Sequence, residues 1–148
     1  MMFKHILVPT DGSELSAVAI KSAITFASET GAALTFFYAR PDFPMPIYGE
    51  GALIDPTTPE QFAQSAEAEA KGILDRAVAD AAAAGVQADT ESVVSEIPYE
   101  AIINTAERRG CDLIFMASHG RRGLAGLLLG SETQRVLTHS KIPVLVYR

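Results

Sequence analysis

The chain has 148 residues, of which 48% are hydrophobic and 20% are charged, a balance that excludes a disordered protein. Its 18 acidic residues against 12 basic ones argue against non-specific nucleic-acid binding. The single cysteine, Cys111, excludes an intramolecular disulfide and a cysteine metal cluster, and no run approaches 18 apolar residues. We therefore expect one domain over residues 1–148, outside the membrane and in the reducing cytoplasm.

The first part of the chain predicts a strand, a helix and a second strand. Residues 2–9 have the apolar content of a buried strand, which the turn residues that follow Pro9 bring to an end. Ser13 can cap the next helix, and Gly31 can terminate it after Thr30. Residues 33–39 form the second predicted strand. The apolar residues of the helix recur at helical spacing and are expected to face inward: Leu15, Val18, Ala19, Ala23, Phe26 and Ala27.

Residues 40–57 are too rich in proline for a helix or a central strand. Such a loop is either a lid over a site or a variable surface segment, and composition does not decide between the two. The next helix has a clear start, because Thr58 can cap it, Pro59 suits the first helical position and Gln61 completes a capping box. Gly85 is its expected end.

The second half of the chain continues the alternation. Residues 86–94 and 112–117 predict strands, with a helix that begins at Pro98 and stops at Gly110 between them. A helix from Ser131 to about His139, with Val136 and Leu137 inward, precedes a last strand over residues 143–146. The order βαβαβαβαβ predicts an α/β fold with a mostly parallel, twisted sheet and helices on both faces. For its five strands we expect a doubly wound sheet with the order 3-2-1-4-5.

The segment after the fourth strand contains glycines at positions 120, 123, 126 and 130 and leads into a helix. A helix start presents unpaired N–H groups and the positive end of the helix dipole, which together favour an anion such as phosphate. Ser131 could cap this helix as Ser-x-x-Gln, and Thr133 adds a second hydroxyl. Glycine loops also serve as flexible connections. The P-loop lysine and the G-x-G-x-x-G dinucleotide fingerprint are both missing.

In a 3-2-1-4-5 sheet the winding direction reverses between the first and fourth strands, and ligands bind beyond the carboxyl ends of the strands there. The turn at Asp11 and the turn at Gly120 should therefore face each other across one crevice. Each residue also has a plainer explanation, since Asp11 can form an Asx turn before Gly12 and His119 can be a solvated loop residue. Arg121 and Arg122 could reach phosphate or simply be solvated.

Gly120, nine intervening residues and Gly130-Ser131 resemble the nucleotide-binding signature G-x2-G-x9-G-(S/T) of the universal stress protein family. Ala117 departs from that signature at its first glycine. Residues 6–13 and 142–146 are similar to the first and last strands of the family, so the resemblance covers essentially the whole chain. A methyl group at Ala117 costs about 1–2 kcal/mol if the backbone there needs positive φ, and nothing if the strand merely ends there.

The resemblance implies a Rossmann-like fold, akin to the adenine nucleotide alpha hydrolases, that binds ATP, or ADP or AMP. Asp11 would accept hydrogen bonds from the nucleoside, Ala39 would line the adenine, and a divalent ion such as Mg²⁺ or Mn²⁺ would be held by the phosphates, since no metal ligand cluster is evident. The family also implies a regulatory homodimer joined through Val144, Leu145 and Val146. The full set of expected nucleotide-binding residues is Pro9, Thr10, Asp11, Ala39, Ala117, Gly120, Gly130, Ser131, Glu132 and Thr133.

Two rival functions remain at the level of sequence. A dimeric stress scaffold that uses no nucleotide is favoured slightly by Ala117. A hydrolase is suggested because Ser118-His119-Gly120 follows a strand as a nucleophile elbow does. However, Met116 stands where G-x-S-x-G needs glycine, and His139 has no assigned acidic partner. We expect no catalytic residue, and at most slow ATP hydrolysis.

Overall fold

The structure is a computed structural model that describes residues 2–42, 58–120 and 129–148. Most of the proline-rich loop, residues 43–57, lies outside the described residues. So does the segment 121–128, which includes Arg121, Arg122, Gly123 and Gly126.

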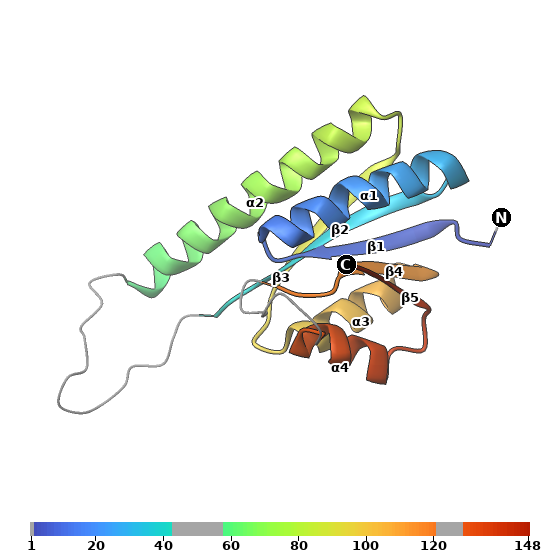
Figure 1. Ribbon diagram of the computed structural model, residues 1–148. Coiled ribbons are helices and arrows are strands. Elements are labelled where there is room, and N and C mark those ends of the chain that lie inside the picture. The colour runs from blue at the N-terminus through green and yellow to red at the C-terminus, as the bar shows by residue number, and fades with distance from the viewer. Residues whose placement is uncertain (1, 43–57, 121–128) are drawn as a thin grey trace.

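Strands and helices alternate along the described part of the chain, as the sequence predicts. One parallel sheet has the strand order β3-β2-β1-β4-β5, which confirms the predicted doubly wound topology (Figure 1). In chain order the elements are β1 His5–Thr10, α1 Glu14–Thr30, β2 Ala33–Arg40, α2 Pro59–Ala83, β3 Ala88–Val94, α3 Pro98–Arg108, β4 Leu113–Ala117, α4 Ser131–His139 and β5 Val144–Tyr147.

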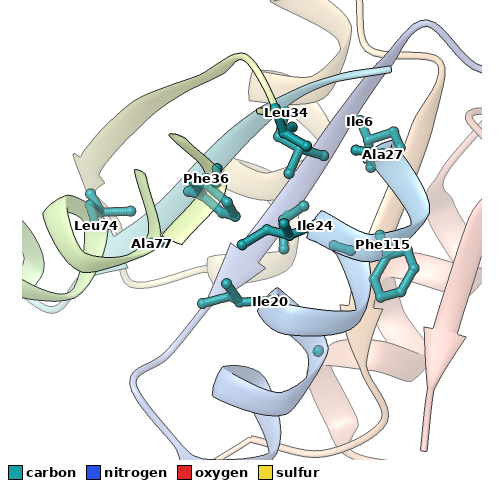
Figure 2. Close-up of a cluster of buried hydrophobic side chains, with 14 of the residues drawn as sticks. Ile6, Ile20, Ile24, Ala27, Leu34, Phe36, Leu74, Ala77 and Phe115 are labelled. Atoms are coloured by element: carbon teal, nitrogen blue, oxygen red, sulfur yellow. The ribbon is translucent and has the colours of Figure 1, made fainter. Parts of the chain in front are cut away.

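Helices cover both faces of the sheet, with α1 and α2 on one face and α3 and α4 on the other (Figure 1). The centre of strand β1 is apolar because both of its faces are buried. Ile6 and Val8 belong to the cluster under α1 and α2, whereas Leu7 belongs to the cluster under α3 and α4, and all three are fully buried. Figure 2 shows the first cluster, in which Ile24 from α1 and Leu74 from α2 lie near the strand residues.

The predicted signals at both ends of α1 and at the start of α2 are confirmed. The Ser13 hydroxyl accepts a hydrogen bond from Ser16 N at 3.2 Å, and Gly31 closes α1 in the left-handed conformation with φ 78°. Thr58 and Gln61 form the full capping box of α2, with both hydrogen bonds at 3.1 Å. These local hydrogen bonds therefore fix where α1 begins and ends and where α2 begins.

Two apolar residues predicted to face inward do not. Val18 on α1 is 45% exposed and Leu137 on α4 is 42% exposed, because the neighbouring Ala19 and Val136 occupy the face toward the sheet and are fully buried. The first strand also begins later than predicted, at His5, where the Asp112 carboxylate accepts from the backbone N–H groups of residues 4 and 5.

Candidate functional site

The central strands β1 and β4 pair over a short distance only. Strand β1 pairs with β2 along its whole length, from His5 to Thr10, but with β4 at Ile6 and Leu7 alone. The two strands are therefore not bonded to each other toward their carboxyl ends. This is the place where the winding direction of the sheet reverses, and where α/β proteins bind their ligands.

A cavity of about 600 Å³ lies at this edge of the sheet. The structure brings all ten residues of the sequence-predicted set together in its wall, although they come from four separate segments: Pro9, Thr10, Asp11, Ala39, Ala117, Gly120, Gly130, Ser131, Glu132 and Thr133. Its volume falls within the range of small-molecule and cofactor sites.

The turn after β1 is fixed by its own polar side chains. Asp11 Oδ1 accepts a hydrogen bond from Ser13 N at 2.9 Å, so the Asx turn that the sequence offers as an alternative is present. The Thr10 hydroxyl accepts from Gly12 N at 3.2 Å and lies 3.0 Å from the Ser16 hydroxyl. Asp11 still lines the cavity, so the turn and a ligand role do not exclude each other.

Both motif glycines lie where an added side chain would be crowded by neighbouring atoms. A Cβ atom at Gly120 would overlap the Asp11 carboxylate. A Cβ atom at Gly130 would lie 3.2 Å from both His119 Cα and Ser118 O, and these are backbone atoms that cannot turn aside. Neither glycine has positive φ, so close approach, and not backbone conformation, is what requires glycine here.

The N-terminus of α4 opens at the cavity. Gly130 is the N-cap residue and provides no side-chain hydrogen bond, so the prediction that Ser131 caps the helix is wrong: Ser131 is the first helical residue. The Thr133 hydroxyl donates instead to Ala117 O at 2.9 Å, and Gly130 N donates to Ser118 O at 2.8 Å. These two bonds fix the start of α4 against the end of β4.

The other described helices have side-chain oxygens at their N-termini. Helices α1 and α2 are capped by Ser13 and Thr58. Helix α3 lacks a cap from its own Ile97, but Glu132 Oε2 on α4 accepts from Tyr99 N at 2.9 Å. Among the helices the structure describes, α4 is thus the one whose first N–H groups have no side-chain acceptor, and it faces the cavity.

Ala117 ends β4 with ordinary extended geometry. No non-glycine residue among those described has positive φ, so the methyl group at this position causes no backbone strain. Its side chain is buried and packs in the cluster under α1 and α2.

His119 is not the solvated loop residue that the sequence allows. It is 9% exposed, lines the cavity, and its Nδ1 atom lies 2.8 Å from the Ser118 hydroxyl. Ser118 itself is 2% exposed and is not part of the cavity wall, which is not how a nucleophilic serine is presented to a substrate.

Sequence reasoning did not assign several further residues of the cavity wall. Arg135 lies one turn into α4, where no motif or strand end marks it. Glu96 follows the carboxyl end of β3, so it could have been found by asking which polar residues the topology brings to this edge. Ser16, on the first turn of α1, could have been found in the same way. The apolar additions are Phe37, Tyr38, Pro98, Ile102 and Met116. These carry no local signal that separates a cavity wall from a core.

The described part of the chain offers neither a metal-ligand cluster nor a membrane-spanning helix. Within residues 2–42, 58–120 and 129–148, no three His, Cys, Asp or Glu side chains are placed to hold a metal ion. None of the described helices is long and apolar enough to cross a membrane.

Comparison with known proteins agrees with the fold and with the motif. The sequence profile of the Universal stress protein family matches residues 2–148. Universal stress protein YxiE of Bacillus subtilis is 34% identical over 151 residues, which cover 99% of this chain and 100% of that protein. The structure of universal stress protein UspA from Lactobacillus plantarum has a TM-score of 0.82 at 27% identity and covers 100% of this chain and 99% of that one. A universal stress protein solved in complex with cAMP has a TM-score of 0.72 at 27% identity and the same coverage. This chain belongs to the universal stress protein family.

Proposed function

We propose that the protein binds an adenine nucleotide in the cavity between the ends of β1 and β4, and that it acts as a regulatory protein whose loaded and empty states contact different partners. The observation that carries this proposal is the open N-terminus of α4. Its first N–H groups face a cavity, and Gly120 and Gly130 leave room for a phosphate to come close to the backbone.

Each wall of the cavity has a role in this proposal. The Asp11 carboxylate accepts hydrogen bonds from the nucleoside, and Ala39 at the end of β2 contacts the adenine. The N–H groups at the start of α4, with the Ser131 hydroxyl, bind phosphate. Phe37, Tyr38 and the residues at positions 102 and 116 supply the apolar surface that an adenine ring needs.

The choice of ligand class is supported by a relative. A universal stress protein with a TM-score of 0.72 to this chain was solved in complex with cAMP. We propose ATP as the ligand of this chain, with ADP and AMP as alternatives. A divalent ion such as Mg²⁺ or Mn²⁺ would be held by the phosphates, because the described residues offer no ligand cluster of their own.

The rival proposal of a scaffold that uses no nucleotide is favoured slightly by Ala117 at the level of sequence. That residue ends β4 without positive φ, so it gives no reason to expect a blocked site. The weak-hydrolase proposal is also less favoured, because the hydroxyl of Ser118 lies outside the cavity wall.

We further propose that the protein is a cytoplasmic homodimer joined along β5. This strand is an edge of the sheet, and Val144, Leu145 and Val146 are each partly exposed. An apolar edge strand can pair with a second copy by forming hydrogen bonds across a twofold axis.

One experiment tests the nucleotide proposal directly. The protein is purified without added nucleotide and denatured, and any released small molecule is identified by chromatography and mass spectrometry. A stoichiometric adenine nucleotide is the expected result. If the protein is empty, ATP at a hundredfold over its dissociation constant should stabilise it by about 2.7 kcal/mol. An empty protein whose melting temperature does not move with ATP would favour the scaffold.

A further inference from the structure

Arg135 lies where it can reach an anion bound at the start of α4. It is four residues after Ser131, so both residues are on the same face of the helix, and helical side chains lean toward the N-terminus. The structure places Arg135 in the wall of the cavity together with Ser131 and Glu132. An arginine in this position can reach back over the first turn of its own helix.

The guanidinium of Arg135 is held by two neighbours. Its Nη1 atom donates to Glu132 Oε1 at 3.0 Å, and its Cζ atom lies 5.9 Å from the centre of the Tyr99 ring. The Arg135 side chain is 55% exposed and that of Glu132 is 35% exposed. An ion pair this exposed between neighbouring helical residues contributes little to stability, so the arginine can change partner at small cost.

Glu132 does not depend on Arg135 for its position. Its other carboxylate oxygen accepts from Tyr99 N at 2.9 Å and so serves as the cap of α3. If Arg135 leaves, one oxygen of Glu132 still has this partner. A phosphate group offers Arg135 two oxygens and a larger negative charge than the carboxylate, and guanidinium groups bind phosphate through paired hydrogen bonds.

We propose that Arg135 is a specificity-determining residue that transfers from Glu132 to the phosphate of the bound nucleotide, and so favours nucleotides over the unphosphorylated nucleoside. This inference rests on the proposed function of the cavity. Glu132 competes with the ligand for the guanidinium, and it therefore sets how strongly Arg135 contributes to binding.

The test compares adenosine, AMP and ATP by calorimetry on the wild-type chain, Arg135→Gln, Arg135→Lys and Arg108→Gln. Arg108 is a matched control, because it is an exposed arginine that pairs with Glu91 away from the cavity. We expect Arg135→Gln to weaken AMP and ATP about tenfold and to change adenosine by less than twofold. Arg135→Lys should retain part of the affinity, and Arg108→Gln should bind all three ligands like the wild type.

The possible results separate the two proposals. Wild-type protein that binds none of adenosine, AMP and ATP would overturn the proposed function and this inference with it. If the wild type and Arg135→Gln bind AMP with the same affinity, this inference alone is overturned. An equal loss for adenosine and AMP would also overturn it, because it would indicate that Arg135 only supports Tyr99 and the local structure.

A double-mutant cycle tests the exchange between partners. Glu132→Gln should tighten AMP binding severalfold when Arg135 is present, because the guanidinium is released from its competitor. The same substitution in the Arg135→Gln background should have little effect. An equal gain in both backgrounds would show that Glu132 acts through its own charge, and would refute the exchange.

Discussion

The carboxylate of Asp11 lies against the backbone of Gly120, so closely that a Cβ atom on that glycine would overlap Asp11 Oδ2. The two residues belong to the turns after β1 and after β4 and are more than a hundred positions apart in the chain. Gly120 therefore has a role that its place in a phosphate motif does not indicate. It leaves the space in which Asp11 can present its carboxylate to the cavity.

We expect Gly120→Ala to weaken adenosine and ATP binding at least tenfold, because the new methyl group displaces the Asp11 side chain. Asp11→Ala should weaken both ligands as well, since the contact that we propose for Asp11 is to the nucleoside. Calorimetry on both single variants and on the double variant tests whether Gly120 acts on binding through Asp11. If Gly120 acts through Asp11, its substitution has little further effect once Asp11 is alanine, whereas additive losses would contradict the coupling.

Two glycines outside the cavity provide a matched pair for stability. Gly72 lies in the middle of α2, and Gly110 follows α3 with φ 70°. A Cβ atom at either would meet nothing within 4 Å. Gly72→Ala should raise the free energy of unfolding by about 0.5–1 kcal/mol, because alanine is the better helix residue. Gly110→Ala should lower it by about 1 kcal/mol, because alanine is strained at positive φ. Urea unfolding of both variants checks these signs, and a change of the same sign in both would contradict them.

The acid stability of the fold should depend on Glu91 in β3. The Arg108 guanidinium, followed by that of Arg109, lowers the pKa of the Glu91 carboxyl from its usual 4.5. A lowered pKa stabilises the fold above the unfolded-state pKa, and this contribution is lost as the pH falls below about 4.5. We expect Glu91→Gln to cost on the order of 1 kcal/mol at pH 7 and almost nothing at pH 2, measured by urea unfolding across this range.

The control for that experiment is Asp75→Asn. Asp75 pairs with Lys71 on the exposed side of α2, where both side chains are more than half exposed. Its substitution should leave the acid transition unchanged. If both variants change the pH dependence of the free energy of unfolding equally, the net charge of the protein, and not the ion pairs of Glu91 with Arg108 and Arg109, controls its stability in acid.

Cys111 should not react in the native protein. Its side chain follows the turn after α3 and is buried, with 5% of the residue exposed. Burial raises the pKa of its thiol to about 11. We expect no labelling by a thiol reagent at pH 8 in the absence of denaturant, and one labelled thiol per chain after unfolding in guanidinium. Rapid labelling of native protein at a rate independent of its unfolding would show that the thiol is accessible.

The sequence predicts the fold well because the features that specify it are local. The capping residues of α1 and α2 and the glycines after the helices mark the elements, and the alternation of strands with helices indicates a parallel sheet covered on both faces. The exposure of Val18 and Leu137 was mispredicted for a different reason. Periodicity finds apolar residues, but the width of the buried face depends on how far the neighbouring element extends over the helix.

The wall of the cavity could be assembled from the sequence only where a motif or a strand end marked it. The contact between Glu132 and Tyr99 N joins two helices, and the overlap at Gly120 involves a residue from another turn. Neither has a signature at fixed spacing. Arg135 was missed because an arginine on a short helix is usually solvated, and its orientation toward the cavity depends on where α4 lies against β4.

The stacked arrangement around Tyr99 has an optical consequence. The Tyr99 ring has two neighbours on α4: the Arg135 Cζ atom lies 5.9 Å from its centre, and the centre of the His139 ring lies 5.2 Å from it. The chain contains four tyrosines and no tryptophan, so tyrosine emission is not masked by indole fluorescence. A guanidinium that leaves Tyr99 when phosphate arrives would alter the light that this ring emits. If Arg135 transfers to the ligand as proposed, tyrosine fluorescence would report occupancy of the cavity without an added dye.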